Sequence, residues 1–210
     1  MMETETERPL RADAARNAER IVRAARAVFA DLGPDAPLEE IARRADVRIR
    51  TLYNHFPSKS DLVRAAVDQA ITEDLAPATE RALADEDPLR GLISLIEAAM
   101  GLVAQELNTV AAARNTGTLT AAAYTPFLES LALLARRAQD AGLLRADLVP
   151  DDLARIMAML TNTLWTMDPG TDGWRRYLAL LFEGLAPAAS NPLPAPAPLR
   201  RGASTASWAG

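Results

Sequence analysis

Apolar residues recur every three or four positions along most of the chain, which is the spacing of one face of an α-helix. Near the N-terminus this spacing predicts a helix over residues 12–31, and Gly33 and Pro34 end it. The apolar face of that helix comprises Ile21, Ala24, Ala25, Val28 and Phe29.

Two short helices are predicted next, over residues 38–45 and 48–55. Asp46 lies between them, and aspartate tolerates the left-handed backbone conformation that a tight interhelical turn requires. Pro57 ends the second short helix, because proline and the residue before it disfavour helical continuation.

A longer helix is predicted from Ser58 to about Leu75, with Pro77 just beyond its end. Ser58 can cap its first turn, and Asp61 stands three residues later as in a capping box.

Prolines also mark the starts of later helices, at Pro88, Pro126 and Pro150. The last two predicted helices cover about 150–167 and 172–185. The fold class expected from this pattern is all-α: a three-helix helix-turn-helix domain followed by a larger helical domain.

The pattern divides the chain into four segments. Residues 1–11 are polar and are expected to be disordered, and residues 12–60 form the small N-terminal domain. Residues 61–186 form the larger domain, and residues 187–210 are a Pro/Ala-rich tail that is expected to be disordered.

Composition excludes several kinds of chemistry. The chain has no cysteine and one histidine, so disulfides, thiolate nucleophiles and multi-histidine metal sites are ruled out. No nucleophile elbow or phosphate-binding glycine loop is found, so we expect no enzyme, no metal and no cofactor. An apolar run long enough to span a membrane and a secretory signal are also missing, so the cytoplasm is the expected compartment.

Charge is unevenly distributed along the chain. Its net charge is −5, but residues 8–64 carry twelve Lys/Arg against eight Asp/Glu. Residues 65–210 carry eleven against seventeen. A basic module joined to an acidic body is expected when only one end of a protein contacts phosphates.

Residues 47–62 concentrate the groups that could contact DNA, including the only histidine and the only lysine. A helix-turn-helix needs an apolar inner face and an outer face of hydrogen-bond donors. Here the inner face is expected to contain Ile41, Ala42, Val47, Leu52 and Phe56, and the outer face Arg48, Arg50, Thr51, Asn54 and Lys59.

These residues resemble the DNA-binding domain of the TetR family of bacterial transcriptional regulators. The resemblance covers about residues 16–64 and is carried by Ile41-Ala42, Ala45-Asp46-Val47, Thr51-Leu52-Tyr53, Asn54-His55-Phe56-Pro57-Ser58-Lys59 and Leu62. It departs from the family pattern at three places: Asp46 replaces a turn glycine, Pro37-Leu38 a capping threonine, and Arg48 a serine.

The resemblance implies a role for each DNA-facing residue. It implies that Tyr53 contacts DNA and that Thr51, His55 and Lys59 contact phosphates. Arg48 and Arg50 would then recognise guanine, and Asn54 on the same outer face would also contact DNA. Taken singly, His55 could instead be a structural histidine, and Lys59 and the two arginines could be ordinary solvated charges.

The resemblance also implies that the larger domain dimerises and binds a small effector. An apolar stripe on the last two helices is the candidate dimer interface: Ile156, Leu160, Leu164, Trp174, Tyr177, Leu178 and Leu181. The candidate effector contacts are Met100, Tyr124, Phe127, Met157, Asn162 and Trp165. Both sets could instead be intrachain core.

The function expected is that of a ligand-responsive repressor, a homodimer that binds a palindromic double-stranded DNA operator and responds to a small-molecule effector. The alternative is an all-helical carrier or partner-binding adaptor without specific DNA binding. No membrane partner is expected.

Overall fold

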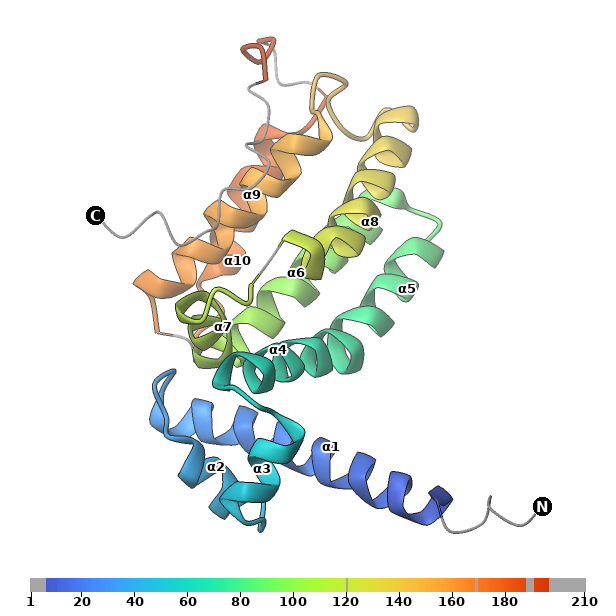
Figure 1. Cartoon of the computed structure of the whole chain (residues 1–210). Coiled ribbons are helices and arrows are strands. Elements are labelled where there is room, and N and C mark those ends of the chain that lie inside the picture. The colour runs from blue at the N-terminus through green and yellow to red at the C-terminus, as the bar shows by residue number, and fades with distance from the viewer. Residues whose placement is uncertain (1–6, 120, 169, 188–190, 197–210) are drawn as a thin grey trace, which may run out of the picture. The chain divides into compact units, whose positions relative to one another are not determined.

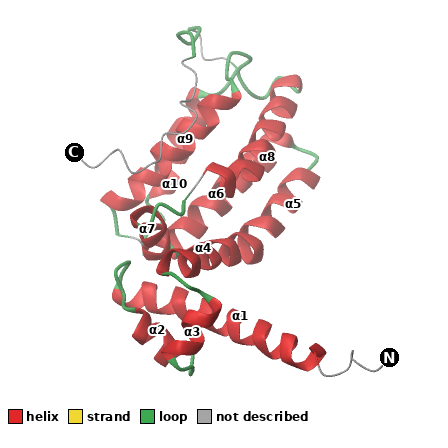
Figure 2. Cartoon of the chain, viewed as in Figure 1, coloured by secondary structure: helices red, strands yellow, loops and turns green. Residues whose placement is uncertain are grey.

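The computed structural model describes residues 7–119, 121–168, 170–187 and 191–196, with side chains omitted for 7–13 and 121–123. Every regular element within those ranges is helical (Figure 2), which confirms the all-α prediction. The described chain forms two compact units, which are treated separately below. In the part of the chain that the structure describes, no helix is long and apolar enough to cross a bilayer.

The first unit joins two separate stretches of sequence, residues up to Gln69 and residues 106–119. Its helices, labelled in Figure 1, are α1 (Glu7–Leu32), α2 (Leu38–Arg44), α3 (Ile49–His55), α4 (Lys59–Ala70) and α7 (Leu107–Asn115).

The core of this unit is the apolar face predicted for the first helix, closed by the helices that follow. Ile21, Val28 and Phe29 of α1 are fully buried, together with Ile41 of α2 and Leu52 of α3. Helices α4 and α7 add Leu62, Val63, Ala66, Ala112 and Ala113 to this core.

The second unit contains η1, a π-helical turn (Ile71–Leu75), then α5 (Ala76–Ala84), α6 (Pro88–Gln105), α8 (Ala121–Asp140), α9 (Pro150–Thr163), η2, a 3₁₀ turn (Leu164–Thr166), and α10 (Trp174–Gly184). Helix α6 is central and packs against α5, α8 and α9. Gly91 permits a close approach of α5 and α6, since a Cβ there would lie 2.6 Å from the carbonyl oxygen of Ala82.

Two prolines do not mark helix boundaries as predicted. The chain stays helical past Pro77, because the π turn before it carries an Ala76 N–H to Ile71 C=O bond and accommodates the missing N–H of proline. Pro126 lies inside α8, which begins at Ala121. As the sixth residue of α8, Pro126 has no N–H to donate to the Ala122 carbonyl, yet the helix continues past it.

Two helices and part of the tail differ from the division predicted from the sequence. Helix α1 begins at Glu7, inside the segment expected to be disordered. Helix α7 was not predicted, and it belongs with the N-terminal unit although it lies more than 40 residues beyond the expected boundary at residue 60.

Part of the tail is attached to the second unit. Arg145 donates a hydrogen bond from Nη2 to the Asn191 carbonyl at 2.8 Å, and the Leu193 N–H donates to the Asp147 carboxylate at 2.8 Å. Residues 191–193 are therefore held by the segment between α8 and α9, whereas 197–210 lie outside the described residues.

Candidate nucleic-acid interface

The turn between α2 and α3 is a Schellman motif. The Asp46 N–H bonds to the Arg43 carbonyl at 3.2 Å and the Val47 N–H to the Ala42 carbonyl at 3.0 Å. Asp46 has φ = 52°, the left-handed conformation predicted from its position in the sequence. Val47 then packs against the core, which fixes the direction in which α3 leaves the turn.

Helix α3 has one buried face and one exposed face. Leu52 is fully buried and Phe56 nearly so, as predicted, and Ile49 also packs against the core. On the outer face Arg50, Tyr53 and Asn54 are exposed, and so is Arg48 at the start of the helix. Thr51 and His55, one turn apart, are half-buried at the edge of the exposed face.

The arginines of α2 and α3 differ in how their charges are balanced. Arg43 forms an ion pair with Glu40, which lowers the pKa of that carboxyl, and Arg44 lies 2.8 Å from Asp31. Among the described residues, no carboxylate pairs with Arg48 or Arg50. Uncompensated positive charge is therefore concentrated on the helix that a helix-turn-helix inserts into the major groove.

Lys59 has a structural contact as well as a position suited to phosphate. Its half-buried ammonium donates to the Ala36 carbonyl at 3.1 Å and lies 5.8 Å from the centre of the Phe29 ring. An ammonium has three donors, so others remain for a phosphate. The start of this helix is capped as predicted, with the Asp61 N–H donating to the Ser58 hydroxyl at 3.1 Å.

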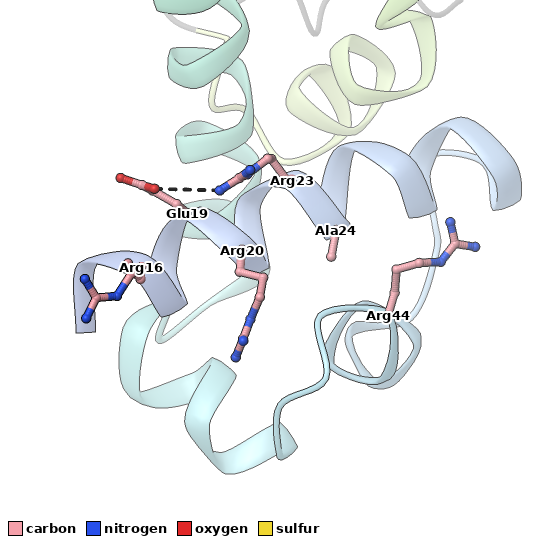
Figure 3. A pocket seen from close by; sticks show the side chains of 6 residues that line it. All are labelled: Arg16, Glu19, Arg20, Arg23, Ala24 and Arg44. Carbon is pink, nitrogen blue, oxygen red and sulfur yellow. Dashed lines mark ion pairs between the residues drawn. The ribbon is translucent and has the colours of Figure 1, made fainter. Parts of the chain in front are cut away.

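A cluster of arginines that the sequence analysis did not assign lines a hollow in the same unit. A cavity of about 510 Å³ is bordered by Arg16, Glu19, Arg20, Arg23 and Ala24 of α1 and by Arg44 of α2 (Figure 3). The four- and three-residue spacing of the α1 arginines was visible in the sequence, but the approach of Arg44 depends on the fold. These six residues are called the arginine pocket below.

Helix α7 is joined to α1 by polar contacts as well as by its buried alanines. The Arg26 guanidinium bonds to the Glu106 carboxylate, with Nε 2.8 Å from Oε1, and both side chains are mostly buried. The Thr109 hydroxyl donates to the other oxygen of Glu106 at 2.8 Å.

The candidate effector residues occupy different environments in the second unit. Met100 and Met157 are buried, Tyr124 and Phe127 are half-buried, and Asn162 and Trp165 are exposed. Their assignment to an effector site stays a prediction.

Most of the candidate dimer residues lie in the core of their own unit, because that part of the stripe packs inward. Five are almost fully buried and cannot present side chains to a partner in this conformation: Ile156, Leu160, Leu164, Trp174 and Leu178. Tyr177 is 47% exposed, and Leu181 is half-buried. The exposed apolar residues of α9 and α10 also include Met159 and Leu180, at 58% and 59%.

Comparison with known proteins supports the interpretation of both parts of the chain. Residues 21–66 match the family model described as bacterial regulatory proteins, tetR family. Residues 80–187 match the model described as transcriptional regulator SbtR-like, C-terminal domain. No curated protein matches the chain.

Several solved structures are similar over most of this chain. A TetR transcription regulatory protein from Mycobacterium vanbaalenii is 30% identical, with 85% of this chain and 99% of that chain covered and a TM-score of 0.60. A TetR transcriptional regulator from Streptomyces coelicolor is 27% identical, covering 82% and 99%, with a TM-score of 0.59. A regulator from Saccharomonospora viridis solved with choline is 21% identical, covering 80% and 96%, with a TM-score of 0.67.

The helix-turn-helix geometry, the uncompensated cations of α3 and the two family matches agree, and they set aside a carrier or adaptor without DNA binding. The chain belongs to the TetR family of bacterial regulatory proteins and is a DNA-binding transcriptional regulator.

Proposed function

We propose that this regulator is a ligand-responsive repressor that binds a palindromic operator as a homodimer. The observation that carries the proposal is the exposed face of α3, where Arg48, Arg50, Tyr53 and Asn54 project from a helix whose other face is anchored by buried Leu52. Arginine is suited to bidentate contacts with guanine, so Arg48 and Arg50 are assigned to base recognition.

Phosphate contacts are assigned to the edges of this face. Thr51, His55 and Lys59 have the donors for such contacts, and Tyr53 can contact the backbone or a base. Because these contacts release counterions, operator affinity should fall steeply with salt.

Dimerisation is proposed through the exposed apolar residues of α9 and α10. The two helices pack against each other, and Met159, Tyr177 and Leu180 on them remain exposed in one chain. A symmetric pair of such surfaces would bury them, and two recognition helices about 34–36 Å apart would fit successive major grooves.

The effector is proposed to be a small molecule bound in the second unit. The Saccharomonospora viridis regulator, which shares this fold, was solved with choline. Effector binding that favours a different separation of the recognition helices would lower operator affinity by the same coupling factor.

A mobility-shift titration on DNA flanking the gene of this regulator tests the proposal. Arg50→Ala should weaken binding by about 5- to 150-fold, since a bidentate arginine–guanine pair contributes about 1–3 kcal/mol of discrimination. Arg136→Ala removes an equally exposed arginine from α8 and should leave affinity unchanged. Binding by Arg50→Ala that equals the wild type would contradict the assignment of α3.

A further inference from the structure

The arginine pocket concentrates like charges on one side of α1. Arg16, Arg20 and Arg23 follow one another at intervals of four and three residues, so their side chains leave the same side of the helix. Like charges at this spacing destabilise a helix in isolation. Arg44 of α2 also borders the hollow, but its guanidinium points away from those of α1 (Figure 3) and pairs with Asp31.

Among the described side chains, carboxylates compensate the charges of Arg20 and Arg23 incompletely. Glu19 lies 3.7 Å from Arg23, and both side chains are more than 60% exposed, so the pair is loose and solvated. Asp31 forms an ion pair with Arg44 but does not itself line the pocket. Among the described side chains, Arg20 hydrogen-bonds only to the neutral amide oxygen of Asn17, at 3.0 Å.

The lining residues also define the chemistry of a suitable ligand. Four of the six lining residues are arginines, and Ala24 is the one apolar residue among them. Guanidinium groups bind phosphate through paired, charge-assisted hydrogen bonds, and their planar donor geometry fits phosphate oxygens.

We propose that the arginine pocket is a phosphate-binding site, separate from the recognition surface of α3. The phosphate can come from the DNA backbone beside the operator or from a free phosphorylated molecule, since the recognition chemistry is the same. The DNA source rests on the proposed function, whereas the free source does not.

Calorimetric titration of the full-length protein with pyrophosphate at low salt tests the free source. If it supplies the phosphate, the wild type should bind and the double variant Arg20→Ala/Arg23→Ala should bind at least about tenfold more weakly. The control Arg136→Ala makes a similar exposed change in α8 and should bind as the wild type does. Unchanged far-ultraviolet circular dichroism would show that the variants are folded.

The salt dependence of operator binding tests the DNA source. If the backbone supplies the phosphate, the double variant should show a shallower plot of log affinity against log salt, by about 0.9 for each phosphate that its side chains no longer neutralise. A duplex shortened to the operator itself should abolish the difference between variant and wild type.

The inference is overturned if the double variant matches the wild type in both measurements. A wild type that binds no specific DNA contradicts the proposed function instead of this inference. In that case the pyrophosphate titration alone tests the arginine pocket. Pyrophosphate binding by the wild type that is weakened in the double variant supports the phosphate site, and any other result overturns it.

Discussion

Asp46 occupies a position that two other helix ends of this chain give to glycine. Helices α7 and α8 end in the same Schellman hydrogen-bonding pattern, with Gly117 and Gly142 at φ = 67° and 69°. Asp46 takes the equivalent position at φ = 52°. A side chain in the left-handed region costs free energy that glycine avoids, although aspartate tolerates it better than most residues.

Asp46→Gly should therefore stabilise the protein by about 0.5–1 kcal/mol, the steric relief being partly offset by the greater freedom of glycine in the unfolded chain. Thermal unfolding followed by circular dichroism measures the change. Asp35→Gly removes an exposed aspartate from the preceding loop without relieving a positive φ, and it should be neutral or destabilising. Equal effects of the two substitutions would contradict this account.

Lys59 combines a structural contact with its expected DNA contact. Lys59→Ala should lower the free energy of unfolding by about 1 kcal/mol, because the Ala36 carbonyl loses its donor and the Phe29 ring loses its cation. Arg64→Ala, further along α4, breaks only a 4.0 Å exposed contact with Asp61 and should cost less than about 0.5 kcal/mol. Unfolding midpoints in urea separate the two, and equal decreases would rule out a structural role for Lys59.

At the scale of elements, the attachment of α7 to α1 depends on a mostly buried ion pair. Glu106→Ala leaves the Arg26 guanidinium without that carboxylate in a poorly solvated place, and it should destabilise the protein by about 1–3 kcal/mol. Glu97→Ala breaks the exposed pair between α6 and Arg175 and should cost less than about 1 kcal/mol. Denaturant unfolding of both variants checks the ranking, and a larger destabilisation by Glu97→Ala would contradict it.

The sequence predicts a helix end well where the residues at that end themselves determine the backbone conformation or the cap. Asp46 marked the left-handed turn, and Ser58 marked the start of α4, because backbone conformation and capping depend on neighbouring residues. Pro77 and Pro126 do not mark helix boundaries, since a π turn accommodates Pro77 and α8 continues through Pro126.

Contacts between residues far apart in the sequence cannot be predicted from these local signals. Periodicity identifies the apolar stripe of α9 and α10 but not what the stripe faces, and Ile156 and Leu178 on it are buried within the chain. Helix α7 is short and rich in alanine, and its place beside α1 depends on residues about 80 positions apart. The DNA-facing residues were assigned by family resemblance, and the arginine pocket needed the approach of Arg44.

At the scale of the whole molecule, the exposed residues of α9 and α10 predict how assembly can be disrupted. Leu180→Arg should convert the proposed dimer to monomers in sedimentation equilibrium, because a charge would be buried between two copies of α10. Leu133→Arg changes a comparably exposed leucine of α8, at 43%, and should leave the assembly intact. A dimer that persists in Leu180→Arg would exclude this surface.

The attachment of the tail should persist in mild acid. The pKa of Asp147 is held well below its ordinary range by hydrogen bonds from Arg145 and the Leu193 N–H. A lowered pKa in the folded state means that this contribution is present above the ordinary aspartate value and is lost only as pH falls below it.

The protection factor of the Leu193 amide in hydrogen exchange should therefore be the same at pH 7 and pH 5. Asp147→Asn should reduce it at both, because the charge-assisted acceptor is gone. Asp140→Asn, at the exposed end of α8, serves as the control and should not change it. Protection that disappears at pH 5 in the wild type would contradict the assignment.

The division of the DNA-binding unit between two stretches of sequence has a consequence for synthesis. Residues up to Gln69 complete their core only with Ala112 and Ala113. At about 5–20 residues per second, the 42 residues between Gln69 and Ala112 delay that completion by about 2–8 seconds on the ribosome. Until α7 has been synthesised, the chain carries the residues of its recognition helix without the helix that completes their core, so this unit should gain its full stability only after Ala113 has been added.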